Sequence, residues 1–445
     1  MITVFEYDEL ALGEKSAGKT LLRTDFEWLA ERVTRTPDLS ESFGTGGGAK
    51  EKSTAFVKWS GRETLSFCHY VGVIELPSGE QLEILPKIYR RAGNLDHQKS
   101  RDTLIRILRT VFPGYGQNSS PASVSSFPCT LPEWVIHNFL QELERLLRLG
   151  LRSAYSPVAR EERFLRGQLD VARQSRQLPH RLHLFHCNYQ NFSLLRPEHR
   201  LLRSATEICR RMAKDEELWR RALRCSEMLS GIPESTNIEG DFRQWKHGRL
   251  MTAYEQMEPW CRLVLGQEFP FAVAGEHRGL SFLFPMERLF EQYVACCLKR
   301  LLKPGFSLRE QAAGKQLFTK ESCKDVRNVN LRPDLLLEKD TEPKTLWVLD
   351  TKWKMINDEG KHSVHDLYQL FTYGSYYLKE SERRNIALIY PLTEEGIAAS
   401  CASPLCFARH DITLWTLFFD VDKGEFHNPP EELEEMFGTE DAASA

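Results

Sequence analysis

The spacing of apolar residues changes along the chain. Up to about residue 95, runs rich in β-branched and aromatic residues predict strands: TAFVKW, ETLSFCHYVGVIEL and EQLEILPKI, the last two separated by a turn at LPSGEQ. From about residue 96 to 268, apolar residues recur at helical spacing, as in RDTLIRILRTVF and PEWVIHNFLQELERLLRLGL. This change of period predicts a β-rich segment followed by a helical one.

A third pattern begins near Pro270. An amphipathic helix, PMERLFEQYVACCLKRLLK, precedes the candidate strands NLRPDLLLEK and TLWVLDTKWK, a helix HDLYQLFTYGSYYLKE and a further strand, RNIALIYPL. We therefore predict a multidomain α+β chain with a β-rich N-terminal domain (1–95), a helical middle domain (96–268), a C-terminal α/β domain (269–430) and an acidic tail (431–445).

Composition places the chain among ordinary globular proteins, with 41% hydrophobic and 27% charged residues. Apolar runs stay well short of the roughly 20 residues that span a bilayer, and the first residues, MITVFEYDEL, are unlike a signal peptide. We expect a cytoplasmic protein with no membrane contact. Eleven cysteines include no C-x-x-C pair, so we expect buried free thiols rather than a zinc site.

Charge is unevenly distributed. The segment from Lys87 to Lys214 carries 22 lysines and arginines against 10 acids, although the whole chain has a net charge of −3. Such a basic middle region attracts phosphate backbones, but solvated helix faces give the same count. The charge alone leaves both interpretations open.

The segment GEKSAGKT, residues 13–20, matches the P-loop pattern G-x-x-x-x-G-K-[ST]. A working P-loop needs a buried strand that leads directly into Gly13 and a helix that begins at about Lys19. DELAL stands between the candidate strand ITVFEY and Gly13. We predict an accidental match in a surface loop that leads into the helix LLRTDFEWLAERV, with a stand-alone NTPase as the rival interpretation.

Candidate chemistry lies in the two strands of the C-terminal domain. RPDLLLEK places Asp334 at the front of an apolar run, and LWVLDTKWK carries Asp350 and Lys352. Side chains alternate across a strand, so Asp350 and Lys352 share a face and can meet Asp334 from the neighbouring strand. Two carboxylates suit a hard divalent cation, and a lysine beside it can orient water or offset phosphoryl charge. The alternative without a function is that Asp350 and Lys352 form an ion pair at the edge of a strand.

Neighbouring features favour the functional interpretation. Asp350 follows LWVL, so it ends a buried strand, where an unpaired charge is costly. Glu287 and Glu291 lie one turn apart on the preceding helix, and Gln369 and Tyr373 share one face of the helix that follows.

The chain contains, in this order, a glutamate on a helix, P-D, D-x-K and Q-x-x-x-Y. With these motifs it resembles the PD-(D/E)xK nuclease superfamily in its RecB-like branch. More narrowly, it resembles the McrC family, the nuclease subunits of McrBC-type modification-dependent restriction systems. The similarity is spread over LEILPKI (82–88), RFLRGQLD (163–170), MERLFEQYV, LRPDLLL, VLDTKWK, DLYQLFTYG and IALIYP. The N-terminal region is longer than in a minimal McrC, so its details transfer least.

The resemblance implies a PD-(D/E)xK (restriction-endonuclease-like) fold for the C-terminal domain and Mg²⁺ as cofactor. It makes Asp334, Asp350 and Glu291 metal ligands, with Glu287 as the other candidate for the helix glutamate, and Lys352 the catalytic lysine. Gln369 and Tyr373 would support the site or contact DNA.

The implied partners are double-stranded DNA and a McrB-like AAA+ GTPase ring, docked by the N-terminal domain, with pairing of two nuclease domains in the complex. Two rivals stay open beside this interpretation: a non-catalytic adaptor that stimulates an NTPase ring, and a RecB-like repair nuclease. The sequence leaves open which DNA modification is recognised.

Overall fold

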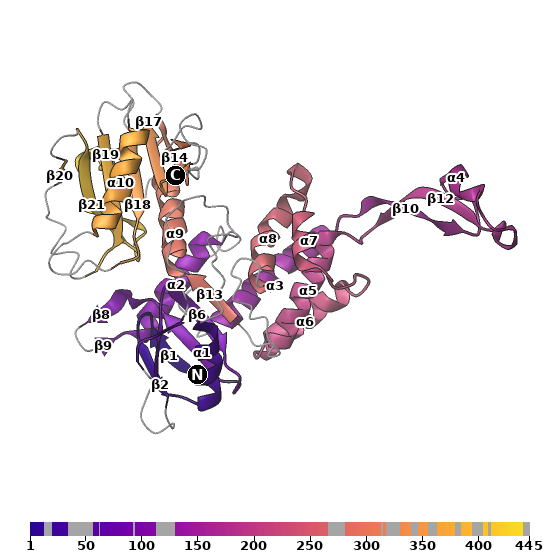
Figure 1. Cartoon of the computed structure of the whole chain (residues 1–445), viewed down its shortest axis with the longest axis horizontal. Helices are drawn as coiled ribbons and strands as arrows, with labels where there is room; N and C mark the ends of the chain where they lie inside the picture. The colour runs from indigo at the N-terminus through magenta and orange to yellow at the C-terminus, as the bar shows by residue number, and fades with distance from the viewer. Residues whose placement is uncertain are drawn as a thin grey trace, which may run out of the picture. The chain divides into compact units, whose positions relative to one another are not determined.

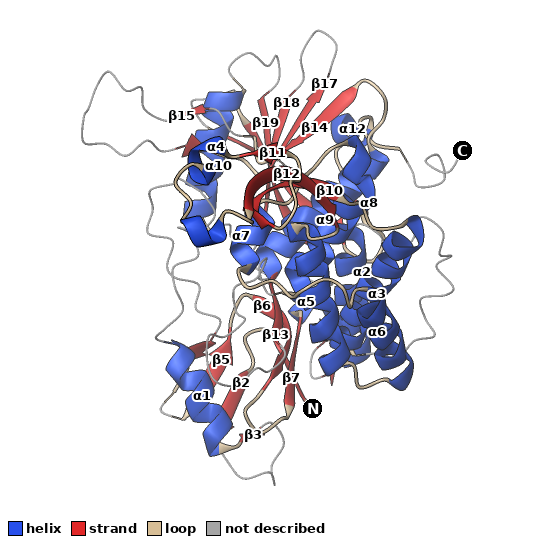
Figure 2. Cartoon of the chain, turned by 90° about the vertical axis from the view of Figure 1, so that its right-hand side faces the viewer, coloured by secondary structure: helices blue, strands red, loops and turns tan. Residues whose placement is uncertain are grey.

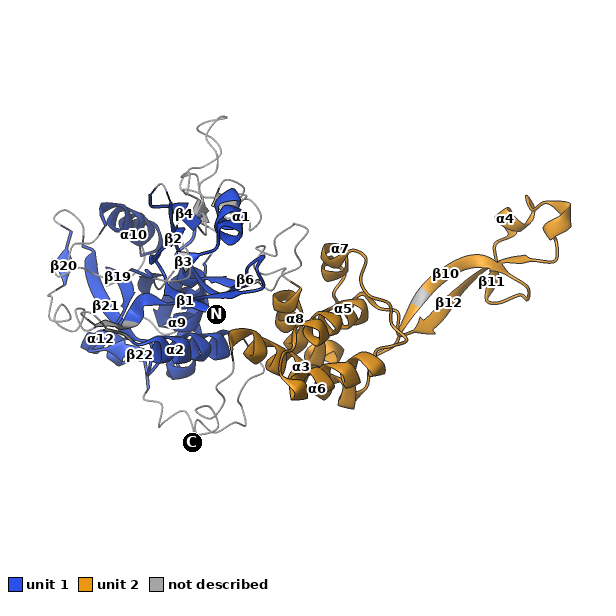
Figure 3. Cartoon of the chain, turned by 90° about the horizontal axis from the view of Figure 1, so that it is seen from below, with its two compact units in different colours: residues 1–112, 274–445 blue, residues 113–273 orange. Residues whose placement is uncertain are grey.

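The computed structural model describes residues 1–12, 20–33, 57–61, 63–91, 94–112, 130–265, 281–312, 315–316, 330–339, 346–354, 363–378, 384–393, 404–407 and 411–438. The chain divides into two compact units: unit 1 combines residues 1–112 with 274–445, and unit 2 is residues 113–273 (Figure 3). Unit 1 thus joins the predicted N-terminal and C-terminal domains, whose separate roles stay predictions. No helix within the described ranges is long and apolar enough to cross a membrane.

The N-terminal part of unit 1 is built from two small sheets. One has the strand order β1-β7-β6-β13 and the other β3-β2-β5-β4, and helix α1 packs on β4 (Figures 1 and 2). The bounds are β1 Ile2–Phe5, β2 Glu9–Leu12, β3 Thr20–Leu21, α1 Arg23–Val33, β4 Val57–Trp59, β5 Thr64–Phe67, β6 Tyr70–Glu75, β7 Gln81–Leu85, β8 Arg90–Arg91, β9 Asn94–Leu95 and β13 Ser281–Pro285.

Strand β13 connects this region to the C-terminal half of the unit. It pairs antiparallel with β6 and leads directly into helix α9 (Met286–Leu301). Gly72 of β6 has a φ of +136°, and a Cβ there would lie 1.8 Å from the carbonyl oxygen of Phe282, so only glycine permits the pairing. Helix α2 (His97–Val111), capped by Asp96, packs against α9.

A larger sheet forms the C-terminal part of unit 1. Its order is β14-β17-β18-β19-β21-β20, with β22 paired to β21, and β18, β19 and β21 are parallel neighbours (Figures 1 and 2). The central strands are mostly apolar and largely buried because both faces of the sheet are covered, and their charged residues lie at the strand ends. The bounds are β14 Phe306–Glu310, β15 Lys315–Gln316, β16 Asn330–Leu331, β17 Leu335–Lys339, β18 Leu346–Thr351, α10 Val364–Tyr377, β19 Arg384–Pro391, β20 Leu405–Cys406, β21 Thr413–Asp420, β22 Glu425–His427 and α12 Glu431–Glu434.

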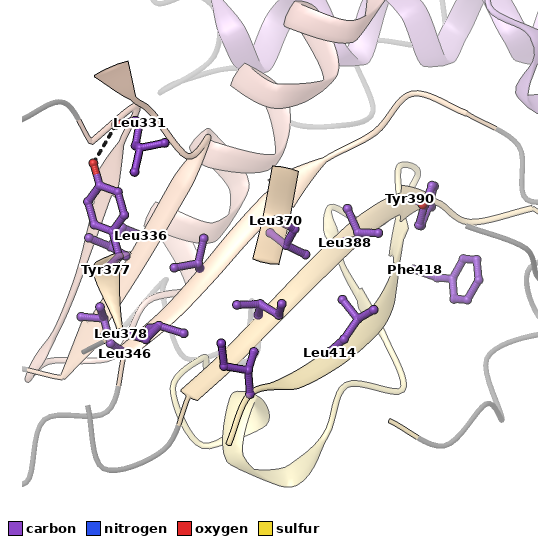
Figure 4. Packing of buried hydrophobic residues seen from close by; sticks show 13 residues of the cluster. Leu331, Leu336, Leu346, Leu370, Tyr377, Leu378, Leu388, Tyr390, Leu414 and Phe418 are labelled. Atoms are coloured by element: carbon purple, nitrogen blue, oxygen red, sulfur yellow. Dashed lines mark hydrogen bonds between the residues drawn. The ribbon is translucent and has the colours of Figure 1, made fainter. Parts of the chain in front are cut away.

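Helices α9 and α10 cover opposite faces of this sheet. Even-numbered residues of β18 and β19, such as Val348 and Leu388, form one apolar cluster with Leu370 and Tyr377 of α10 (Figure 4). Phe290 of α9 instead contacts odd-numbered positions, including Phe419 of β21. A Cβ on Gly374 would lie 2.7 Å from Ile386, so glycine allows α10 to approach the sheet closely.

Unit 2 is built around a group of packed helices. Helix α3 starts with a capping box between Thr130 and Glu133 and packs on α6 and α8, where Trp134 contacts Trp260 at 5.7 Å between ring centroids. The bounds are α3 Leu131–Leu149, α4 Val171–Gln174, α5 Pro197–Met212, α6 Glu216–Met228, α7 Ile238–Arg243 and α8 Thr252–Val264.

A long β-hairpin interrupts the region that the sequence analysis expected to be helical. Strands β10 (Ala154–Glu162) and β12 (Phe185–Ser193) pair antiparallel along their whole length, β11 (Gln168–Leu169) adds to β12, and α4 lies near the tip. Figure 3 shows this hairpin extending away from the helices of unit 2. The predicted helical domain over 96–268 thus contains a β-hairpin that the helical spacing of apolar residues did not indicate.

The predicted P-loop look-alike lies at the edge of what the structure describes, since residues 13–19 fall outside it. The flanking elements differ from the expectation that DELAL separates the preceding strand from Gly13. Strand β2 ends at Leu12, so a strand does lead directly into Gly13. Thr20 nevertheless belongs to strand β3, whereas a P-loop threonine lies in the first turn of a helix.

Part of the predicted acidic tail is structured. Helix α12 and Phe437, which forms a bridge with Leu302, are described, and residues 439–445 are not.

Candidate active site

The candidate site lies where β17 begins and β18 ends. The antiparallel register pairs Leu335 with Leu349, so the next position places Asp334 opposite Asp350. Directly opposed residues of a sheet project to the same face. This is the even-numbered face, which is covered by α10.

Asp350 and Lys352 form a buried ion pair. The Nζ atom of Lys352 lies 2.5 Å from Oδ2 of Asp350, whose residue is only 1% exposed. At this distance the contact is a charge-assisted interaction between the ammonium and the carboxylate. Burial and the nearby charge of Asp334 raise the pKa of Asp350 to about 7, although Lys352 opposes the rise.

The side chain of Asp334 is hydrogen-bonded to β18, the strand that carries Asp350. The backbone N–H and the Oγ1 hydroxyl of Thr351 both donate to Oδ2 of Asp334 at 2.8 Å. Burial and the negative charge of Glu291 raise the pKa of Asp334 to about 6, against the effects of Lys352 and Thr351. Burial lowers the pKa of Lys352, but the charges of Asp350 and Asp334 outweigh it and the net pKa is raised.

Helix α10 contributes the two polar residues that the sequence analysis named. Lys352 Nζ donates to Oε1 of Gln369 at 3.4 Å, and Nε2 of Gln369 donates to the hydroxyl oxygen of Tyr373 at 3.0 Å. Four residues apart on one helix face, these side chains form a chain of hydrogen bonds that ends at the lysine. The structure therefore brings Asp334, Asp350, Lys352, Gln369 and Tyr373 together.

The two candidate helix glutamates have different surroundings. Glu291 accepts from Nε2 of Gln311 at 2.9 Å, and burial raises its pKa, with the charge of Asp350 adding to the rise. Glu287 lies 3.3 Å from Nδ1 of His69, and its pKa is lowered by that contact. Glu291 is thus the glutamate whose charge acts directly on the two aspartates.

The donor set fits a magnesium ion held by two aspartates. Among the described residues, no group of three His, Cys, Asp or Glu side chains is arranged as a metal site, so the role of Glu291 as a third ligand stays a prediction. Mg²⁺ commonly takes one or two protein carboxylates and fills its other positions with water and phosphate oxygens. Asp334 and Asp350 suit that role, since their pKa values are raised by burial and by a neighbouring carboxylate, Glu291 for Asp334 and Asp334 for Asp350.

Comparison with known proteins identifies the family. A family model described as "McrBC 5-methylcytosine restriction system component" matches residues 65–391, well over half of the chain. The chain belongs to this family. The match runs from β5 to the end of β19 and includes every predicted site residue. The predicted resemblance to McrC is confirmed.

Two solved structures resemble the chain, and the first of them shows the same fold. One is the refined half-complex from a tetradecameric assembly of Thermococcus gammatolerans McrB AAA+ hexamers with bound McrC, with a TM-score of 0.56, 20% identity and coverage of 95% of this chain and 97% of that chain. The cryo-EM structure of the Thermococcus gammatolerans McrBC complex aligns with a TM-score of 0.48 and 20% identity, covering 67% of this chain and 87% of that chain. No curated protein matches the chain.

Sequence reasoning missed several residues that shape this McrBC-family site. Thr351 holds Asp334, and Gln311, with a φ of 43°, bonds Glu291 through its side chain while its N–H donates to the carbonyl oxygen of Asp334 at 2.7 Å. Lys354 forms an ion pair of 2.9 Å with Asp366 in the first turn of α10. The alternation that gave Asp350 and Lys352 also reaches Lys354, but nothing local in the sequence indicated Gln311.

Proposed function

We propose that this chain is the DNA-cleaving subunit of a McrBC-type restriction complex and that its C-terminal sheet is a PD-(D/E)xK nuclease fold. The reaction is Mg²⁺-dependent hydrolysis of phosphodiester bonds in double-stranded DNA. The observation that carries the proposal is the buried Lys352–Asp350 pair with Asp334 on the adjacent strand. Buried charges in proteins are paired or bind a metal, and here two carboxylates share one lysine, which leaves negative charge for a cation to balance.

The residues divide the chemistry as follows. Asp334 and Asp350 hold Mg²⁺, which when bound supplies positive charge against the phosphate and the attacking water. Lys352 stays protonated, because its raised pKa lies well above neutrality, and its ammonium offsets charge that develops on the phosphate. Gln369 and Tyr373 fix the direction of the Lys352 side chain through their hydrogen bonds.

We further propose an AAA+ GTPase as the partner, since the related Thermococcus assembly contains McrC bound to McrB AAA+ hexamers. Pairing of two nuclease domains in the complex belongs to the same proposal. The sequence analysis assigned docking to residues 1–95. The hairpin of unit 2 is a second candidate, because it exposes large apolar side chains, which are typical of contact sites: Phe164, Leu165, Val171, Leu178 and Leu182.

A cleavage assay tests the proposal against its two rivals. The full chain is mixed with its AAA+ partner, nucleotide and plasmid DNA with or without 5-methylcytosine, in Mg²⁺ or in EDTA. We expect Mg²⁺-dependent cleavage of the methylated plasmid, which Asp334→Asn abolishes and Glu338→Gln, a control on the same strand, leaves intact. GTPase stimulation without any cleavage would favour the adaptor, and cleavage indifferent to methylation would favour a repair nuclease.

A further inference from the structure

A carboxyl group just after the first strand of the chain contacts the residue next to the predicted catalytic lysine. Glu6 follows β1, is 0% exposed, and its Oε2 accepts a hydrogen bond of 2.9 Å from Nε1 of Trp353. Trp353 directly follows Lys352 and is itself buried, with its ring 5.2 Å from that of Phe290 on α9. This hydrogen bond therefore joins the start of the chain to the segment that follows β18, next to Lys352, and Trp353 in turn packs on α9.

The backbone around Glu6 is fixed independently of this bond. The N–H of Glu6 donates to Leu85 at 2.9 Å, and the N–H of Tyr7 donates to Phe67 at 2.6 Å. Tyr7 has a φ of 65°, and the N–H of Asp8 returns to the carbonyl oxygen of Phe5. This tight turn is anchored to both N-terminal sheets and holds the Glu6 side chain in one direction.

A second contact connects the N-terminal region to the start of α9. The carbonyl oxygen of His69, which has a φ of 62°, accepts from the N–H of Met286 at 2.8 Å, and its Nδ1 lies 3.3 Å from Glu287. Met286 begins the helix that carries Glu291. The N-terminal sheets thus contact the site through the end of β18 and through the start of α9.

We propose that Glu6 is a positioning residue of the nuclease centre: its bond to Trp353 fixes the end of β18, and with it Lys352, so that the N-terminal sheets are a working part of the site. The inference rests on the proposed nuclease function for its effect on cleavage. The structural link between Glu6 and the end of β18 can be measured without any activity.

The buried surroundings of Glu6 favour a neutral acceptor. Burial raises the pKa of Glu6 to about 8, against the lowering effect of the hydrogen bond from Trp353, so the acid is mostly protonated at pH 7. Glutamine has the same shape, carries no charge and offers the same carbonyl oxygen to an indole N–H. Leucine keeps similar bulk but offers no acceptor. The pair Glu6→Gln and Glu6→Leu therefore separates the hydrogen bond from packing.

Hydrogen exchange of the full chain gives the first test. The N–H of Lys352 donates to Ile389 at 2.8 Å, so its protection reports how firmly the end of β18 is held. We expect faster exchange in residues 346–354 of Glu6→Leu, and wild-type exchange there in Glu6→Gln. Exchange in residues 413–420 of β21 should be unchanged in both variants.

A matched control removes a buried carboxylate that does not touch the site. Glu83 of β7 is also buried, but it is bound by Arg101, with its Oε1 accepting from Nε at 2.7 Å. Glu83→Leu should destabilise the same sheet without selectively raising exchange in residues 346–354. A comparable selective rise in Glu83→Leu would overturn the proposal, because it would show a general response to a weakened sheet.

Cleavage by the reconstituted complex gives the second test. For Glu6→Leu we expect kcat to fall by about ten- to a hundredfold with KM for DNA unchanged, because small misplacements of catalytic groups cost on that order. Trp353→Phe, which keeps the ring and loses the N–H, should give the same loss even if Glu6→Leu folds poorly. Glu6→Gln should restore the wild-type kcat.

Three further results would contradict the proposal: wild-type protection and kcat in Glu6→Leu, a Glu6→Gln variant as impaired as Glu6→Leu, or a Trp353→Phe variant of full activity. If the wild-type complex does not cut DNA, the proposed function fails. The exchange measurements would then still decide whether Glu6 holds the end of β18.

Discussion

Strand β18 and the hairpin β10–β12 are both extended and regularly paired, but they differ in burial. All six residues of β18 are buried, and the charge at its end is paired within the protein. In the hairpin only Cys187 is fully buried among the residues whose burial is described, and large apolar side chains face solvent. The two regions therefore differ in what their side chains can do. At β18, burial shifts pKa values, whereas in the hairpin, exposure makes apolar side chains available for contact.

The largest expected effect separates chemistry from stability at β18. Asp350→Asn removes a proposed metal ligand, so Mg²⁺-dependent cleavage should fall by at least on the order of 10²-fold, since a bound metal supplies several kcal/mol of transition-state stabilisation. The same change relieves repulsion with Asp334 but also removes the carboxylate partner of the buried Lys352, so the two effects oppose each other and the variant should remain folded in EDTA, as circular dichroism would show. Cleavage at the wild-type rate by Asp350→Asn would remove the site assignment.

The second prediction compares the same substitution in the two regions. Leu349 of β18 is 0% exposed and Leu165 of the hairpin is 60% exposed. Leu349→Ala should lower the free energy of unfolding by about 2–5 kcal/mol, whereas Leu165→Ala should change it by less than about 0.5 kcal/mol. Denaturant unfolding measures both. A large loss in Leu165→Ala would mean that the hairpin packs against other parts of the protein in solution.

The sequence contained the local part of this picture. Asp350 and Lys352 alternate along one strand, Gln369 and Tyr373 lie four residues apart on one helix, and each spacing alone indicated a shared face. The hairpin was missed because AYSPVAREE contains proline and two acids, and its apolar residues are not directed into a core. Exposure on both faces removes the alternation that usually marks a strand.

Contacts between distant parts of the chain were beyond reach for another reason. Glu6 and Trp353 are 347 positions apart, and β13 joins a sheet whose other strands lie before residue 86. No local period encodes such a pairing, and with one sequence there is no covariation to reveal it. Strand β2 was missed for a different reason, because ELAL is too short to be identified as a strand from its own residues.

The third prediction concerns the pH dependence of stability. Because burial raises the pKa of Glu6 from 4.5 to about 8, its stabilising contribution is fully present below about pH 4.5 and is lost as pH rises through about 8. Glu6→Gln does not titrate at this position, so the wild type should lose stability relative to this variant between about pH 4.5 and about pH 8, by an amount on the order of a few kcal/mol at most, and the difference should then stay constant at higher pH. If the unfolding free energies of the wild type and of Glu6→Gln changed with pH in the same way, the raised pKa of Glu6 would be contradicted. Glu338→Gln, on a partly exposed strand position, is the control.

The last prediction tests what the exposed hairpin does, and its expected effect on stability is the smallest. Phe164 is 82% exposed and Trp59, on β4 of the N-terminal region, is 48% exposed. Because neither aromatic ring is fully buried, Phe164→Ser and Trp59→Ser should each change the free energy of unfolding little, Phe164→Ser by less than about 0.5 kcal/mol.

Their effects on association with the AAA+ partner should differ. A contact surface concentrates its binding energy in a few apolar or aromatic anchors, and exposed apolar residues gather on the hairpin: Tyr155, Phe164, Leu165, Val171, Leu178, Leu182 and Phe192. We therefore expect Phe164→Ser to weaken association by about tenfold or more, corresponding to at least 1.4 kcal/mol, and Trp59→Ser to leave it unchanged. Binding of each full-length variant to the partner, measured by titration, decides between the two surfaces. A loss confined to Trp59→Ser would return docking to residues 1–95, because the exposed apolar surface of the hairpin would then contribute nothing to the interface.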